Sequence, residues 1–136
     1  MNEIGMEVTI SQPYENAINL VKSALRDEGF GVLTEIDVKA TMKTKLNKDF
    51  RPYAILGACN PPLAYRALNS KPEIGLLLPC NVTIESIDSR ASIIRFLDPK
   101  IMVTLGDMGE NTALAEVATE AQESLKRVIE SLSAWA

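Results

Sequence analysis

Two Cys-Asn dipeptides are the residues of this sequence best suited to chemistry. Cys59-Asn60 and Cys80-Asn81 supply the chain's two thiols, each followed by an amide side chain. A thiolate is a nucleophile and a ligand for soft metal ions, and asparagine can donate and accept hydrogen bonds. The pairs therefore suggest a pocket used for redox exchange, for a small ligand or for a soft metal ion.

The elements around the dipeptides decide whether the thiols meet. Cys59 ends the apolar stretch from Tyr53 to Cys59, which is typical of a buried strand, and Cys80 begins the stretch from Cys80 to Ile87. Neighbouring antiparallel strands would place both thiols at one end of the sheet, whereas parallel strands would place them at opposite ends. Cys59 also directly precedes a predicted helix start, where backbone N–H groups and the helix dipole favour a thiolate.

A structural interpretation of these residues stays open beside the functional one. Free cysteine is often buried and behaves as a small hydrophobic residue. Asn60 can cap the helix that follows it. The sequence has no Cys-x-x-Cys motif, and Cys59 and Cys80 alone do not complete a zinc site. Metal binding would therefore need carboxylates, water or a partner subunit.

Arg66 is a further candidate for the same pocket, since it lies about one helical turn beyond the Cys59 motif. Its guanidinium could hold an anionic group of a ligand. The alternative is a surface ion pair with a carboxylate such as Glu73.

A run of basic residues interrupts an otherwise acidic chain. It could gather an anion such as a phosphate or carboxylate. A charge run of this kind is more often the solvated face of a helix. The run consists of Lys39, Lys43, Lys45, Lys48 and Arg51.

Composition excludes several classes of function. The 136 residues contain no histidine, which excludes Ser-His-Asp and Cys-His catalytic sites and histidine-bearing zinc sites within the chain. A net charge of −4 argues against a general nucleic-acid partner. No apolar run is long enough to span a membrane, and Met1 to Ile4 lack the features of a signal peptide. We expect a cytoplasmic protein with no membrane partner.

Hydrophobic periodicity and turn residues predict a single α+β domain over residues 1–136. Few helices are available to cover the sheet, so we expect an antiparallel sheet with helices packed on one face and short helical inserts between strands. A homodimer would cover the other face. Predicted strands are 6–11, 32–36, 53–59, 80–87 and 91–97; predicted helices follow Pro13, Asp37, Asn60, Asp98 and Asn111.

Two long motifs carry a resemblance to a known family. The runs from Ile55 to Tyr65 and from Glu73 to Val82, together with Gly29 to Val38, Ile87-Asp88 and Asp98-Pro99, resemble the prokaryotic family called domain of unknown function 302. The resemblance covers nearly the whole chain. It implies a fold like that of the TATA-binding protein, β-α-β(4)-α, and a homodimer. It implies no activity, cofactor or DNA binding.

Two hypotheses of function follow from these residues. The first is a small homodimeric binding module whose cleft holds a small ligand or a metal near Cys59, Asn60, Cys80 and Asn81. The second is a thiol-dependent enzyme or redox protein, with Cys59 as the reactive sulfur and Cys80 as its partner.

Overall fold

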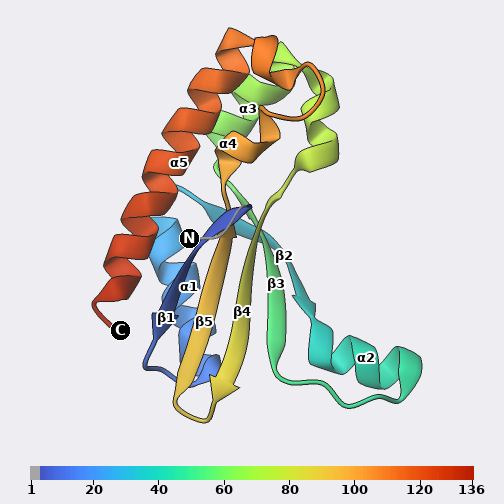
Figure 1. Ribbon diagram of the computed structural model, residues 1–136, viewed down its shortest axis with the longest axis vertical. Helices are drawn as coiled ribbons and strands as arrows, with labels where there is room; N and C mark the ends of the chain where they lie inside the picture. Colours follow the sequence, from blue (N-terminus) through green and yellow to red (C-terminus); the bar gives the residue numbers. More distant parts are fainter. Residues whose placement is uncertain (1–3) are drawn as a thin grey trace.

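A twisted five-stranded antiparallel sheet forms one layer of the molecule (Figure 1). The computed structural model describes residues 4–136; the first three residues, on which the signal-peptide expectation partly rests, lie outside the described part. The strand order is β1-β5-β4-β3-β2. The strands are β1 (Gly5–Ile10), β2 (Gly31–Asp37), β3 (Tyr53–Cys59), β4 (Cys80–Asp88) and β5 (Ala91–Leu97).

Two long helices cover one face of this sheet. They are α1 (Tyr14–Asp27) and α5 (Thr112–Ser133), and their apolar stripes pack on the strands and on each other. Alternate strand residues point into the layer between sheet and helices, because successive side chains of a strand face opposite sides. The largest fully buried side chains of this core include Ile10, Leu25, Leu56, Ile84, Phe96 and Leu125.

The predicted α+β class and the order β-α-β(4)-α are confirmed. Short helical segments lie between the strands and before α5, as expected. They are α2 (Val38–Leu46), α3 (Pro61–Ser70), η1 (Pro72–Leu77), α4 (Pro99–Met102) and η2 (Met108–Glu110).

Side-chain caps fix the starts of the inserted helices and of α5. The carboxylate of Asp37 accepts a hydrogen bond from the Ala40 N–H at 2.9 Å, and Asn111 accepts one from Leu114 at 3.1 Å. Gly29 ends α1 with a φ of 85°, a left-handed conformation that glycine adopts at little cost. Asp37 and Asn111 lie directly before helix starts that the sequence predicts.

A close backbone approach explains Gly57 in the middle of β3. A Cβ atom built at this position would lie 2.2 Å from Thr34 Oγ1 and 2.7 Å from Pro79 Cγ. Any side chain here would push apart β2 and the segment before β4, so glycine is required by packing.

The sheet face opposite the helices is charged. Arg95 pairs with Glu85 at 2.6 Å and with Glu7 at 3.3 Å, and Arg51 also pairs with Glu85. These contacts cross from β4 through β5 to β1. An antiparallel sheet with such a face can remain in water, so this face does not by itself require a second subunit.

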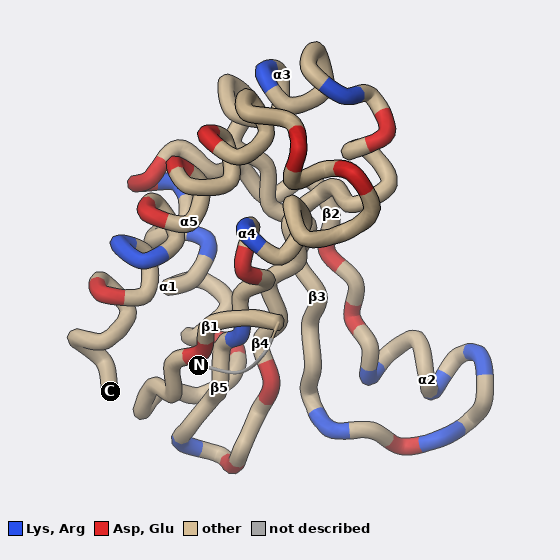
Figure 2. Tube along the Cα trace, turned by 45° about the horizontal axis from the view of Figure 1, so that its top comes forward, with Lys and Arg blue, Asp and Glu red and all other residues tan. Residues whose placement is uncertain are grey.

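The helix α2 projects from the sheet as an arm and buries none of its residues (Figure 1). Residues 38–51, which we call the α2 arm, hold five basic residues and one acidic residue. Figure 2 shows these positive charges gathered on the arm, apart from most of the acidic residues. The basic run is therefore an exposed feature, as the structural interpretation of the sequence expected.

Among the described residues, no helix combines the length and apolar character needed to cross a membrane.

Candidate functional site

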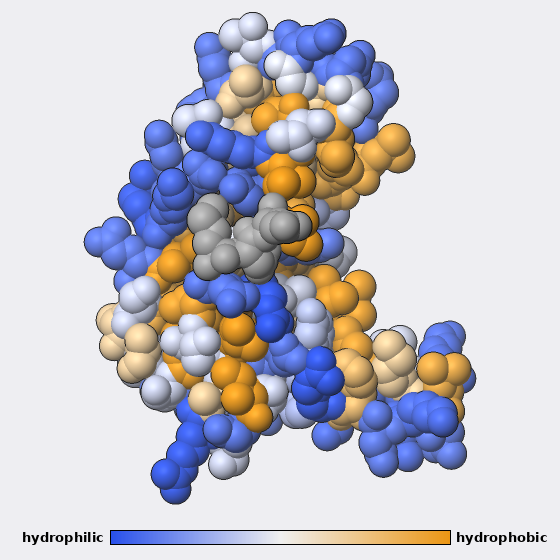
Figure 3. Space-filling view, in the orientation of Figure 1, coloured by the Kyte–Doolittle hydropathy of each residue, from blue (hydrophilic) through white to orange (hydrophobic). Residues whose placement is uncertain are grey.

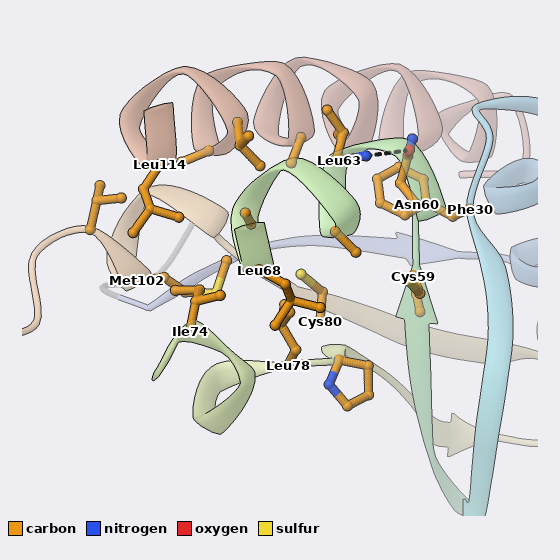
Figure 4. A pocket seen from close by; sticks show the side chains of 18 of the residues that line it. Phe30, Cys59, Asn60, Leu63, Leu68, Ile74, Leu78, Cys80, Met102 and Leu114 are labelled. Carbon is orange, nitrogen blue, oxygen red and sulfur yellow. Dashed lines mark hydrogen bonds between the residues drawn. The ribbon is translucent and has the colours of Figure 1, made fainter. Parts of the chain in front are cut away.

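The strands that carry the two cysteines are antiparallel neighbours. In the β3–β4 pair Ala58 lies opposite Cys80, and Cys59 is the next residue along β3. The predicted strand arrangement is confirmed, and both cysteines line one cavity (Figure 4). The structure therefore brings together two residues separated by twenty others in sequence.

The cavity has a volume of about 300 Å³ and an apolar wall. It lies between α3 and α5, over the end of β3 and the start of β4, and η1 and α4 close its other sides (Figure 4). None of the nineteen described residues that line it carries a charge. They include Phe30, Cys59, Asn60, Leu63, Leu68, Ile74, Leu78, Cys80, Met102 and Leu114.

Small residues on two facing helices leave the space. Ala64 and Ala67 lie on α3, and Ala118 and Ala121 lie on α5; all four line the cavity. Each pair is spaced three residues apart, so its members share one face of their helix. The α3 and α5 helices contact each other, but methyl side chains at these positions fill little of the gap.

Cys80 is held in its neutral form. Its residue is 8% exposed, and burial raises the pKa of the thiol to about 11, with a smaller contribution from the neighbouring Cys59. Desolvation acts this way because it disfavours the charged form. Cys80 therefore presents a protonated, weakly polar sulfur to the cavity at neutral pH.

Cys59 is half-buried at the end of β3. The backbone N–H groups at the start of α3, beside it, are bonded or absent. Pro61 and Pro62 have no N–H. The Leu63 N–H donates to the side-chain oxygen of Asn60 at 3.4 Å, and the Ala64 N–H donates to its backbone oxygen at 2.9 Å. The N–H groups of this first turn are therefore missing or already bonded, so the helix start offers Cys59 no free backbone donor.

Asn60 lines the cavity but acts chiefly as a cap. Its side-chain oxygen accepts from Leu63, and its amide nitrogen packs against Gly29, where a Cβ atom would lie only 3.2 Å away. The side chain thus joins the end of α1 to the start of α3. Figure 4 shows it at one end of the cavity, beside Phe30.

Asn81 does not line the cavity. Cys80 and Val82 are buried beneath the helices, and Asn81 between them is exposed on the other face of β4. The alternation of strand side chains accounts for this. The second Cys-Asn pair thus divides between the two faces of the sheet.

Arg66 also lies outside the cavity lining. Its guanidinium contacts Glu120 on α5 at 2.6 Å, and this hydrogen bond is the main cause that raises the pKa of Arg66. The ion-pair interpretation holds, with a different partner from Glu73, which pairs with Lys71 at 3.3 Å.

The donor set for a metal is incomplete around the two cysteines. No group of three or more Cys, Asp or Glu side chains able to hold a metal ion occurs within residues 4–136. Two thiols in an apolar wall leave the other positions of a tetrahedral site unfilled.

A second hollow, which sequence reasoning missed, adjoins the cavity. It has a volume of about 340 Å³ and shares Phe30 and Leu33 with the cavity lining. Lys22, Arg26 and Glu35 supply its charges. The alanine spacing on α3 and α5 was the one sequence signal for the cavity; the hollow left no such signal, since its charges come from α1 and β2.

Comparison with known proteins agrees with the geometry. The profile of the family described as "Domain of unknown function DUF302" matches residues 6–132. A crystal structure of an uncharacterized conserved protein DUF302 from Bacillus stearothermophilus is similar at 28% identity, with a TM-score of 0.84. The match covers 96% of this chain and 99% of that one.

Among curated proteins none matches this chain. The family match extends from β1 to the last turn of α5 and so includes every residue of the cavity lining. The resemblance in the sequence motifs is confirmed, and the chain belongs to the DUF302 family, a domain of unknown function.

Proposed function

We propose that this protein is a binding module for a small, largely apolar molecule held in the cavity between α3 and α5. The observation that supports it is the uncharged wall around about 300 Å³ of space. Ligand pockets of this size, apolar with a few polar groups, are the usual form of small-molecule sites.

A binding role fits the two thiols better than catalysis does. A thiol-dependent reaction needs a thiolate, but burial keeps the pKa of Cys80 near 11, so it is protonated at neutral pH. The helix start beside Cys59 has no free N–H group to offer. The protonated sulfur of Cys80 instead contributes polarizable contacts to an apolar ligand.

Filling the cavity tests this proposal. The neutral dye N-phenyl-1-naphthylamine becomes fluorescent in apolar sites, and wild-type protein should bind it saturably. Ala118→Leu adds side-chain volume to the lining, whereas Ala113→Leu makes the same change at an exposed position of α5. We expect A118L to abolish binding and A113L to retain it. Absence of saturable binding to wild-type protein would refute the proposal.

We also propose that the module works as a homodimer in which the α2 arm packs on a second copy. A nine-residue helix that buries nothing gains little stability from its own hydrogen bonds. Large apolar side chains lie exposed on this side of the molecule: Leu33 and Ile36 on β2, Leu46 on α2 and Leu76 on η1. Figure 3 shows apolar surface on both sides of a broad indentation in the outline of the molecule, between the arm and the end that carries α3.

Charge supports a second copy as the occupant. The α2 arm has a net charge of +4, so the other residues together carry −8 within the chain's total of −4. Each arm of a two-fold dimer would then meet an acidic partner surface, and opposite charges favour such an encounter.

Sedimentation equilibrium tests the dimer. Leu46→Asp places a charge on the arm, and Leu105→Asp makes the same change at an exposed leucine between α4 and η2. We expect L46D to shift wild-type dimers to monomers and L105D to leave them intact. A monomeric wild-type protein, or dimers of L46D as stable as wild type, would contradict the proposal.

A further inference from the structure

The apolar cavity and the charged hollow lie next to each other and share two residues. Phe30 and Leu33 line both spaces. Phe30 is buried, whereas Leu33 is 68% exposed. A molecule that enters the cavity past Leu33 can therefore extend into the hollow.

A β-bulge places Leu33 at this junction. In the β2–β3 pair Val32 lies opposite Ala58 and Thr34 lies opposite Gly57, so Leu33 has no partner of its own. An extra residue of this kind redirects a side chain and is common beside functional sites. Without the bulge, regular alternation would put Leu33 on the sheet face away from the helices.

The charges of the hollow leave one cation available. Lys22 is engaged with Glu35 at 2.6 Å. Arg26, in the last turn of α1, is exposed, and no carboxylate within the described residues forms an ion pair with it. The hollow thus offers a guanidinium at one end of an apolar path.

We infer that the site takes an amphipathic anion, a medium-length alkyl chain with a carboxylate or phosphate head. This inference rests on the proposed binding function. The chain occupies the cavity, crosses Leu33, and places its head on Arg26. A guanidinium suits either head because its N–H groups match the geometry of two anionic oxygens.

The uncharged lining requires this division of the ligand. An anion inside the cavity would lose its hydration and gain no charged partner there, so this position is strongly unfavourable. The head must therefore lie outside the apolar wall, and the adjoining hollow is where the structure supplies a cation.

Competition with the neutral dye tests the head group. Decanoate, decyl phosphate and 1-decanol have the same alkyl chain and differ in the head. We expect both anions to displace the dye from wild-type protein at about three- to fivefold lower concentration than the alcohol, the range of an exposed ion pair. Added salt should reduce this preference, since exposed charges are screened.

Substitution of Arg26 tests whether its guanidinium causes the preference for anionic competitors. Arg26→Gln should remove the advantage of both anions and leave displacement by 1-decanol unchanged. Arg90→Gln, in the exposed β4–β5 turn, should keep the wild-type order. The two anions separate the sources: a fatty-acid site favours decanoate, and a phosphate-ester site favours decyl phosphate.

The outcomes distinguish failure of the anion inference from failure of the proposed binding function. If the dye binds and 1-decanol competes as well as the anions, the anion inference is overturned and the apolar binding site stands. An anion preference that persists in R26Q also overturns it. If the dye does not bind wild-type protein, the binding function itself fails.

Discussion

The two Cys-Asn dipeptides are identical in sequence and opposite in structural role. In the first, Cys59 is half-buried at the end of β3 and Asn60 caps α3, so both residues line the cavity. In the second, Cys80 is buried in the cavity wall, while Asn81 faces solvent on the other side of β4.

The difference comes from where each dipeptide lies on its strand. Within β4, alternation sends adjacent side chains to opposite faces, so Cys80 and Asn81 cannot share a site. At the end of β3 the chain leaves the strand for a helix, and adjacent residues can turn toward one space. A short motif therefore has no fixed geometry until its element is known.

Cys59 and Cys80 should differ most in the stability that is lost when each is replaced by a charged residue. Cys80→Asp places a carboxylate in an uncharged wall at a residue that is 8% exposed. We expect the free energy of unfolding to fall by on the order of 4 kcal/mol, since the charge has no partner there. Urea denaturation measures this change.

Cys59→Asp is the matched variant for that experiment. Its side chain is only partly buried, so water can reach the carboxylate and the loss should be about half as large. Equal losses for the two variants would show that Cys59 and Cys80 share one environment, against the difference in their burial.

Alkaline pH should separate Cys80 from the rest of the chain. Its pKa is about 11 in the folded protein against an ordinary value of 9.0, so between these values the unfolded chain loses the proton first. The folded state then holds more protons, and stability must fall as pH rises from about 9 to 11, by at most about 3 kcal/mol.

Comparison with Cys80→Ala isolates this contribution. Other groups titrate in the same range, but Tyr14, whose pKa is raised to about 12 mainly by burial, is present in both proteins. Urea denaturation at several pH values should show a steeper loss for wild type than for C80A above pH 9. Parallel curves would mean that Cys80 is not desolvated.

The two asparagines should differ by a smaller amount. Asn60→Ala removes the side-chain acceptor of the Leu63 N–H, and loss of an N-cap typically costs about 1 kcal/mol of stability. Asn81→Ala changes an exposed side chain and should alter stability by less than about 0.5 kcal/mol. Unfolding curves that coincide for N60A and N81A would contradict the cap.

Local rules were sufficient to predict the five strands and the helices α1 to α5 from the sequence, but not the short segments η1 and η2. Asp37, Asn60 and Asn111 cap the helices that they precede, and Gly29 ends α1, because each signal acts on its own backbone within a few residues. The antiparallel sheet was expected, but whether β3 and β4 are neighbours, which brings Cys59 and Cys80 together, is a tertiary feature that the sequence left open.

The cavity could not be predicted by the same rules. It exists because Ala64 and Ala67 face Ala118 and Ala121 across two helices that lie far apart in sequence. The bulge at Leu33 likewise depends on how β2 registers against β3. Both features arise from tertiary packing, which periodicity within one segment does not contain.

Arg66 provides the smallest expected effect and separates sequence proximity from membership of the site. It lies six residues after Asn60 in the sequence, yet its guanidinium contacts Glu120 on the solvent side of α5. Water screens the exposed ion pair of Arg66 and Glu120, so the pair adds little stability. Neither residue lines the cavity.

Arg66→Ala should therefore leave both dye binding and the midpoint of urea unfolding indistinguishable from wild type. Arg26→Ala, at the adjoining hollow, should weaken only anionic competitors. A clear loss of dye affinity in R66A would mean that α3 turns this side chain toward the ligand. Closeness to Cys59 in the sequence would then decide which residues reach the ligand. The position of each dipeptide on its strand would no longer explain which residues line the site.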